Sequence, residues 1–364
     1  AGTETGMYIS FNDGKDWNSF QLNLPIVPIT DLTIKDSNLI VATQGRSLWM
    51  IDDLSLIHQL FDSDLSKNLL FKPKDTYRMR GRSTKESKTN GTNHPNGVMT
   101  YFNLKDLKDD DKVSLTYFDT KGDTIKTFSN KDKKNKLTVK KGTNQFVWNM
   151  TYDGAERLEG MILWWASLEG PRATPGQYKV SLSIEDSLKS NIVEMSKPFT
   201  ILADPRAEST LVDMQKQFVF IKDVNKTMDD AHKSIKKIRA VNKQLGAFQN
   251  QYKDDDNVKA LVEKAKALEE QLSVIEKELY QTKNRSGQDP LNFPIKLTNK
   301  LGHLNALVSM GDFAPTEQDI AVKNELSGQI KKQLDAFNTI LNDEVKAFNT
   351  AFNAKQLNYL FVED

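Results

Sequence analysis

Three acidic residues lie close in sequence to a pair of tryptophans near the middle of the chain. Glu156 and Glu159 precede Trp164-Trp165, and Glu169 follows it. Glycosidases use two carboxyl groups about 5 to 10 Å apart, and an indole ring presents a flat apolar surface on which a sugar can stack. Glu159, Trp164 and Trp165 are therefore one candidate surface for a ligand or a partner. The alternative is that the two tryptophans pack inside a β-sandwich or at its contact with a helical bundle.

A second polar cluster begins shortly after Leu279. It combines two glutamines, an asparagine, an arginine and an aspartate, namely Gln281, Asn284, Arg285, Gln288 and Asp289. The cluster lies between two segments with helical periodicity, and connections within helical bundles usually have about two to eight residues. The sequence leaves two interpretations open: a loop packed against the neighbouring domain, or a recognition surface for a ligand or partner.

Other common catalytic and metal-binding patterns are absent from the sequence. The four histidines, His58, His94, His232 and His303, are scattered, and none lies four residues from another. The chain has no cysteine, which excludes disulfides, thiolate metal sites and cysteine nucleophiles. It has neither a glycine-rich phosphate loop nor a Gly-x-Ser-x-Gly motif. We therefore expect no metal, no cofactor and no catalytic centre within this chain.

The overall composition narrows the class of protein further. The 50 Lys and Arg residues balance 49 Asp and Glu, so the basic surface of a nucleic-acid-binding protein is not indicated. No apolar run approaches the roughly 20 residues that a transmembrane helix needs. No signal peptide is visible, and the chain opens at Ala1 without a methionine. A length of 364 residues predicts two or three domains, and we expect a processed chain or a fragment.

Residues 1–60 read as short β-strands separated by turn residues such as Asp13-Gly14 and Gln44-Gly45. The strand-like runs are Met7–Phe11, Asn18–Leu22, Ile29–Ile34, Asn38–Thr43 and Ser47–Ile51. We expect them to form one antiparallel sheet, which is too small to fold alone. Such an incomplete unit indicates structural neighbours upstream of residue 1.

Residues 70–203 are also of β type. Short runs alternate apolar and polar residues, and Lys121-Gly122 lies at the tip of a predicted hairpin between two of them. Pro175-Gly176 is a turn that precedes a last pair of strands. The runs are Val98–Leu104, Val113–Phe118, Thr124–Phe128, Gln145–Met150, Tyr178–Ile184 and Phe199–Leu202. This density of short strands is typical of an immunoglobulin-like β-sandwich.

Residues 204–364 change to helical periodicity. Seven apolar residues follow each other at spacings of three and four, which places them on one face of a helix: Val258, Leu261, Ala265, Leu268, Leu272, Ile275 and Leu279. The preceding helix has a similar face that is interrupted by Asn225 and His232. We interpret His232 as a hydrogen-bonded polar position that fixes helix register.

Two prolines predict the starts of two further helices, at Pro290 and after Pro315. The last helix is expected to bury Leu326, Ile330, Leu334, Phe337, Leu341, Val345, Phe348 and Phe352. Four amphipathic helices in sequence predict an antiparallel four-helix bundle. Its first two helices would form a long hairpin around Asp254-Asp255-Asp256.

The octet from Ser10 to Trp17 resembles an Asp-box, the Ser-x-Asp-x-Gly-x-x-Trp hairpin found in β-propeller blades. Ser10, Gly14 and Trp17 match the pattern, and Asn12 stands where an aspartate is usual. The short polar side chains can close the turn on their own backbone, the glycine allows a positive φ, and the tryptophan folds back as an apolar plug. The role expected for these residues is structural.

The resemblance extends over essentially the whole chain. The chain is similar to the C-terminal part of large BNR-repeat propeller proteins, sortilin-like (VPS10-type) or labelled as glycosyl hydrolases, from Bacteroidota and related bacteria. The matching segments are Asp31–Asp53, Pro95–Gly97, Phe146–Trp148, Gly160–Trp164, Pro175–Tyr178, Leu279–Asn284 and Ser286–Pro294. The resemblance implies upstream propeller blades as partners in the same protein, export to the periplasm, outer membrane or medium, and a glycan or cell-envelope protein as ligand.

We therefore expect an α+β chain with a last propeller blade (1–60), an immunoglobulin-like sandwich (70–203) and a helical bundle (204–364). Its expected role is a non-catalytic region that caps the propeller and docks a partner, since a propeller fold by itself does not imply hydrolysis. One alternative is that the loops around Glu159 and Trp164 complete a glycoside hydrolase site on the missing propeller. Another is a component of a cell-envelope adhesion or secretion complex.

Overall fold

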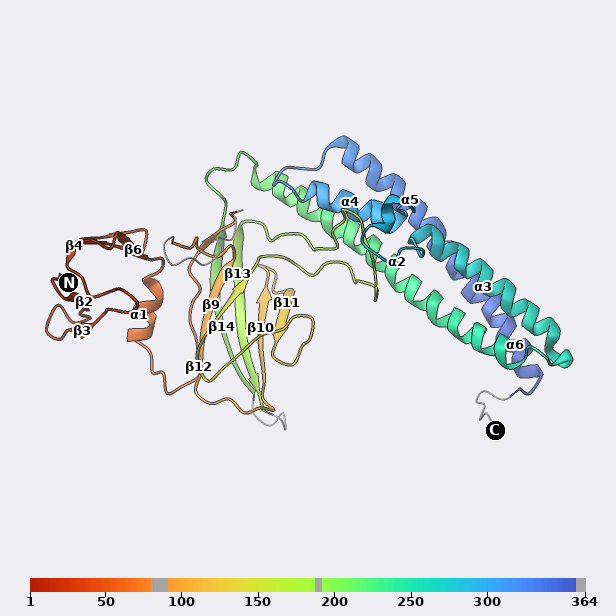
Figure 1. Ribbon diagram of the computed structural model, residues 1–364, viewed down its shortest axis with the longest axis horizontal. Helices are drawn as coiled ribbons and strands as arrows, with labels where there is room; N and C mark the ends of the chain where they lie inside the picture. The colour runs from red at the N-terminus through yellow and green to blue at the C-terminus, as the bar shows by residue number, and fades with distance from the viewer. Residues whose placement is uncertain (80, 82–90, 187–191, 358–364) are drawn as a thin grey trace. The chain divides into compact units, whose positions relative to one another are not determined.

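The chain divides into two compact units, a mainly β unit and a helical unit (Figure 1). The computed structural model describes residues 1–79, 81, 91–186 and 192–357. The first unit contains residues 1–150 and 175–206, and the second contains residues 151–174 and 207–364. The expected α+β class is confirmed. None of the helices within the described ranges combines the length and apolarity needed to cross a membrane.

The N-terminal strands form two separate three-stranded antiparallel sheets. The first sheet has the order β1-β2-β3 and the second β4-β5-β6. Their bounds are Gly2–Thr3, Gly6–Ile9, Asn18–Ser19, Ile29–Lys35, Asn38–Thr43 and Leu48–Ile51, followed by helix α1 at Ser55–Phe61. The expectation of a single sheet is therefore wrong. Pro25 and Pro28 lie between β3 and β4 and have no amide hydrogen to donate to a ladder, so pairing stops there and restarts.

The rest of the first unit consists of a five-stranded and a three-stranded sheet. One has the order β11-β10-β13-β14-β8 and the other β12-β9-β7. The bounds of β7 to β14 are Leu69–Leu70, Thr76–Tyr77, Val98–Leu104, Lys112–Phe118, Thr124–Ser129, Gly142–Trp148, Gly176–Glu185 and Ile192–Leu202. The six predicted runs all lie within or overlap these strands, and the hairpin at Lys121-Gly122 joins β10 to β11.

An aromatic core joins these two sheets. Tyr117 on β10 and Trp148 on β12 are fully buried, and their rings stack with centroids 4.5 Å apart. The Tyr117 hydroxyl lies 2.8 Å from the Thr100 hydroxyl on β9. Burial raises the pKa of Tyr117, because the charged phenolate would lose its hydration inside the core.

The second unit contains five α-helices within the described residues. They are α2 (Leu211–Gln251), α3 (Lys259–Leu279), α4 (Leu297–Val308), α5 (Glu317–Thr339) and α6 (Lys346–Ala354), with a π-helical turn between α5 and α6. The seven predicted face residues of α3 are all buried. Side-chain hydrogen bonds join Arg239 to Glu276 and Gln249 to Glu269, so α2 and α3 run antiparallel. The predicted helical hairpin is confirmed.

Residues 151–174 leave the first unit between β12 and β13 and group with the helices. The segment doubles back on itself: Tyr152 N donates to Pro171 O at 2.9 Å, and Ala155 N donates to Leu168 O at 2.9 Å. A Cβ added at Gly154 would lie 1.9 Å from Leu168 O, so only glycine allows this approach. The chain from 70 to 203 is thus not one continuous β-domain.

Candidate functional site

The octet from Ser10 to Trp17 forms the compact hairpin that its sequence predicts. Ser10 Oγ accepts from Gly14 N at 2.8 Å, and Asn12 Oδ1 accepts from Asp16 N at 2.9 Å. The Trp17 indole donates to Gly14 O at 3.0 Å. Gly14 has φ = 79°, the left-handed conformation that favours glycine. Asn12 thus supplies the acceptor oxygen that an aspartate would, and the side chains of Ser10, Asn12 and Trp17 hydrogen-bond within the turn. Trp17 is 52% exposed, so the prediction that it forms an apolar plug is wrong.

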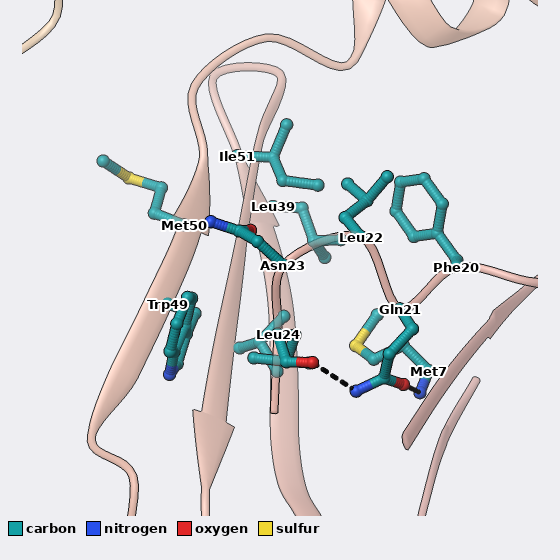
Figure 2. A pocket seen from close by; sticks show the side chains of 11 residues that line it. Met7, Phe20, Gln21, Leu22, Asn23, Leu24, Leu39, Trp49, Met50 and Ile51 are labelled. Carbon is teal, nitrogen blue, oxygen red and sulfur yellow. Dashed lines mark hydrogen bonds between the residues drawn. The ribbon is translucent and has the colours of Figure 1, made fainter. Parts of the chain in front are cut away.

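A second turn uses the same tryptophan contact. The Trp49 indole donates to Arg46 O at 2.9 Å across the turn between β5 and β6. Trp49 and Leu39 line an apolar hollow with Met7 and Phe20 (Figure 2). Gln21 closes the base of this hollow: its Oε1 accepts from Met7 N at 3.1 Å and its Nε2 donates to Leu24 O at 2.8 Å. The hollow offers a ligand few free polar groups, since the Gln21 amide is committed to backbone.

The 151–174 segment is held by polar side chains of the helices. Asn225 on α2 accepts from Ala155 N at 3.4 Å and donates to Glu169 O at 2.8 Å. Asp229, one turn further along α2, accepts from Glu156 N at 2.9 Å. Burial raises the pKa of Asp229, but hydrogen bonds from Lys233 and from Glu156 N outweigh this and lower it below its ordinary value.

The next turn of α2 places His232 against the same segment. His232 is fully buried, and its Nδ1 lies 2.6 Å from Glu156 O. A carbonyl oxygen can only accept, so Nδ1 carries the hydrogen. Among the described residues Nε2 has no hydrogen-bond partner. Burial lowers the pKa of His232, against smaller opposing effects of Glu156 and Asp229. The prediction that His232 is a hydrogen-bonded polar position is confirmed, with a loop carbonyl as its partner.

Helix α4 holds the second half of the segment. Asn299 accepts from Trp164 N at 2.7 Å and donates to Trp164 O at 2.8 Å. His303 Nδ1 lies 2.7 Å from Trp165 O. Asn305 donates to Ser167 O at 3.1 Å and to Glu169 O at 3.0 Å. An irregular segment of this kind needs such partners, because buried backbone groups without hydrogen bonds are costly.

The two predicted tryptophans occupy different environments. Trp164 is half-buried, whereas Trp165 has 72% of its surface exposed. Their ring centroids are 6.5 Å apart with planes tilted by 38°. Trp165 also has φ = 48°, an unusual conformation for a bulky residue. Glu159 is exposed at the start of the same stretch. The structure thus binds the Trp164 backbone to Asn299 of α4 and leaves the Trp165 side chain open to solvent.

The second predicted cluster forms an ordered connection between α3 and α4. Asp289 accepts from Arg285 N at 2.5 Å and from Ser286 N at 2.9 Å, and these bonds lower its pKa. Gln281 donates to Pro294 O at 2.8 Å. Asn284 is buried, and within the described residues its Oδ1 has no partner. Most of these polar groups therefore fold the connection upon itself.

The same corner of the helical unit contains both predicted clusters. Tyr280, which ends α3, accepts from Ile162 N at 2.9 Å, while Asn299 of α4 binds Trp164. The residues on either side of the 281–296 connection thus hold the backbone of the tryptophan stretch. Glu156, which lies earlier in the 151–174 segment, forms an ion pair with Lys236 on α2.

None of the shifted carboxyl pKa values in the described ranges is raised. A glycosidase general acid needs a raised carboxyl pKa, whereas the carboxyls with shifted pKa values in the described ranges, Asp64, Asp213, Asp229 and Asp289, all have lowered ones. No cluster of three His, Asp or Glu residues among the described residues could hold a metal ion.

Sequence reasoning missed the residues that hold the segment. Asn225 and His232 stood out as breaks in an apolar face, but Asn299 and Asn305 gave no comparable signal, because Asn is common on helix surfaces. Their partners lie 135 to 138 residues away in sequence. Comparisons of the chain with protein-family models, with curated proteins and with solved structures found no match.

Proposed function

We propose that the chain is the non-catalytic C-terminal region of an exported Asp-box propeller protein. In this proposal the two N-terminal sheets are parts of its last blades, residues 70–150 and 175–203 form an immunoglobulin-like sandwich, and the helices form an antiparallel bundle. The region would close the propeller and carry a binding surface outside it. The proposal rests on the sequence resemblance and on one feature of the second sheet.

That feature is an exposed apolar strip on one face of the β4-β5-β6 sheet. On one face Leu39 and Val41 are buried in the small N-terminal core. On the other, the pairs Ile40–Met50 and Ala42–Leu48 lie side by side on β5 and β6. Leu48 is 70% exposed and Met50 is 58% exposed. β4 contributes the polar residues Asp31 and Thr33 to this second face, so its exposed apolar strip covers β5 and β6. Such a strip marks a contact surface, as a blade has towards its neighbour in a propeller.

The connection after α1 supports the closing role. Lys74 Nζ donates to Asp36 O at 3.2 Å and to Asp52 O at 3.0 Å, so it ties the β4–β5 turn to the end of β6. Lys72 N donates to Gln59 Oε1 at 2.7 Å, and Gln59 Nε2 donates back to Lys72 O at 3.1 Å. The chain is thus fastened to the last sheet as it leaves it, which suits a terminal blade whose edge must be covered.

A single-thiol probe tests the proposal, since the chain has no cysteine. Met50→Cys should react rapidly with a maleimide in the 364-residue chain. In the protein extended by its upstream sequence it should react at least about tenfold more slowly, because a buried thiol reacts only through transient opening. Lys121→Cys, on the β10–β11 turn, is the control and should react equally fast in both proteins. Equal rates for Met50→Cys would contradict an upstream blade on this face.

Activity measurements test the non-catalytic part of the proposal. The 364-residue chain should release no reducing ends from oligosaccharides. The rival reading, a hydrolase site completed by the tryptophan stretch, predicts turnover in the extended protein that Glu159→Gln abolishes without a change in melting temperature. An extended protein that is inactive, or whose turnover survives this substitution, supports the binding role.

A further inference from the structure

We infer that the free edge of β12 binds an extended acidic segment of another polypeptide as an added β-strand. The inference rests on the proposed function in treating this region as a non-catalytic binding module. It extends that function by naming the binding surface and the chemistry of its partner.

The first support is the direction of the β12 backbone groups. β12 ends its sheet, whose order is β12-β9-β7. On the other side of β9, Phe71 N donates to Tyr101 O at 3.0 Å, so the backbone of Tyr101 points towards β7. Gln145 lies opposite Tyr101, and this pair is therefore not hydrogen-bonded. Because backbone direction alternates along a strand, the N–H and C=O groups of Thr143, Gln145 and Val147 point to the free edge.

The second support is that β12 lacks the features that keep sheet edges from pairing. Exposed edges are usually short, or they carry charges or prolines. β12 has seven residues, Gly-Thr-Asn-Gln-Phe-Val-Trp, with neither a charge nor a proline. The other edge strands of six or more residues within the described ranges, β4 and β11, contain Asp31, Lys35 and Lys126. Among the described residues the outward groups of β12 have no backbone partner.

The third support is a hollow beside this edge. Its volume is about 460 Å³, and it is lined by Thr143 and Gln145 of β12, by Tyr101 of β9 and by the segment 138–140. Extended peptides bind at sheet edges through main-chain hydrogen bonds, and hollows for alternate side chains give the specificity. Unpaired backbone groups and a hollow thus occur together at the start of β12.

The charges around the hollow select the partner. Among the described residues that line it, Lys140 is the one that is charged, and it is exposed. Its backbone is fixed by the Asn144 side chain, which accepts from Lys140 N at 2.8 Å and donates to Lys140 O at 2.7 Å. Burial raises the pKa of the Tyr101 hydroxyl, and the negative charges of Asp53 and Asp52 raise it further. A carboxylate is therefore attracted towards Lys140 and repelled near Tyr101.

This charge arrangement also gives the bound segment a direction. β12 already pairs antiparallel with β9, and antiparallel pairing is slightly the more stable kind. In an antiparallel added strand, the C-terminal residues lie beside the start of β12, where Lys140 is held. The acidic residue therefore belongs near the C-terminal end of the bound segment.

Amide chemical shifts of the full 364-residue chain, measured by TROSY NMR, test the inference. The probe is an acetylated and amidated heptapeptide of alternating threonine and valine in which glutamate replaces the last valine. The matched probe has the same composition, with glutamate in place of the first valine. We expect the first probe to bind with a Kd of about 1 mM or tighter and to shift the amides of Thr143, Gln145 and Val147. The matched probe should bind about two- to fivefold more weakly, the usual effect of an exposed ion pair.

Paired variants isolate the backbone contact and the charge. Gln145→Pro removes an outward amide hydrogen, which an edge strand tolerates, and should weaken binding by at least about fivefold through the lost hydrogen bond. Gln145→Thr loses the same side chain but keeps the amide hydrogen and should retain the affinity. Lys140→Ala should make the two probes bind equally. Lys141→Ala, which removes a lysine paired with Asp106, should preserve their difference.

The outcomes separate this inference from the proposed function. Failure of the first probe to bind, or equal affinity of folded Gln145→Pro and Gln145→Thr as judged by their melting temperatures, would overturn strand addition. If Gln145→Pro does not fold, the wild-type titration and the lysine variants still decide. Equal affinity of the two probes for the wild type would overturn the acidic partner. None of these results bears on the thiol reactivity of Met50→Cys.

Discussion

At the scale of single residues, His232 shows how a buried titratable group couples loop and helix. Its Nδ1 hydrogen bonds Glu156 O, while its Nε2 faces the interior. The negative charges of Glu156 and Asp229 raise the pKa of His232, and the positive charge of Lys236 lowers it. Burial is the largest influence and keeps the folded-state pKa below the usual value of 6.5. The neutral form is therefore the one that the folded chain selects.

This environment predicts acid sensitivity. Below about pH 6.5 His232 binds a proton in the unfolded chain but not in the folded chain. The free energy of unfolding therefore decreases as the pH is lowered, until the folded-state pKa is reached. Above about pH 7.5 His232 should contribute no pH dependence. His232→Asn keeps a donor for Glu156 O without titrating, and it should flatten the decline in urea unfolding between pH 7.5 and 5. Parallel curves for wild type and His232→Asn would refute the assignment.

At the scale of elements, helix starts were predictable where capping chemistry decides them. Pro315 predicted α5, which begins at Glu317 with a capping box between Thr316 and Asp319. Pro290 predicted the start of a helix, but the structure has a single 3-10 turn there. Pro294, four residues later, has no amide hydrogen and disfavours helix in the residue before it. A continuous helix could only start beyond it, and α4 begins at Leu297.

The capping box of α5 gives a direct test of this account. Thr316 Oγ1 accepts from Asp319 N at 3.1 Å, and Asp319 Oδ2 accepts from Thr316 N at 2.9 Å. Thr316→Ala should lower the free energy of unfolding by about 0.5–2 kcal/mol, since it leaves an orphan amide at the helix start. Thr350→Ala is the matched control: its exposed hydroxyl only bonds Lys346 O within α6, and alanine favours helix there. Similar losses for both variants would contradict a capping role.

At the scale of the whole molecule, the two units are interleaved in the sequence, because residues 151–174 of the helical unit lie between two parts of the β unit. The periodicity of the strands and helices could not reveal this. Strand and helix periods separated β from α structure near Asp204-Pro205, and that boundary holds to within a few residues. The 151–174 segment has neither period, because its conformation is set by partners on α2 and α4 rather than by its own neighbours. Ala155, Leu158 and Met161 from this segment belong to the core of the helical unit, so the helices depend on residues encoded far upstream.

That dependence predicts complementation between two pieces of the chain. A fragment of residues 207–364 should unfold at a lower temperature than the same unit in the intact chain, since Asn225, Asn299 and Asn305 would lose their backbone partners. Removal of the segment also uncovers the apolar surface that Ala155, Leu158 and Met161 bury, and the lost burial lowers the free energy of unfolding. A synthetic peptide of residues 151–174 should bind the fragment and raise its melting temperature, whereas a peptide of the same composition in scrambled order should not. If the fragment alone melts at the temperature of the intact unit and the peptide has no effect, then the segment only lies upon helices that fold without it.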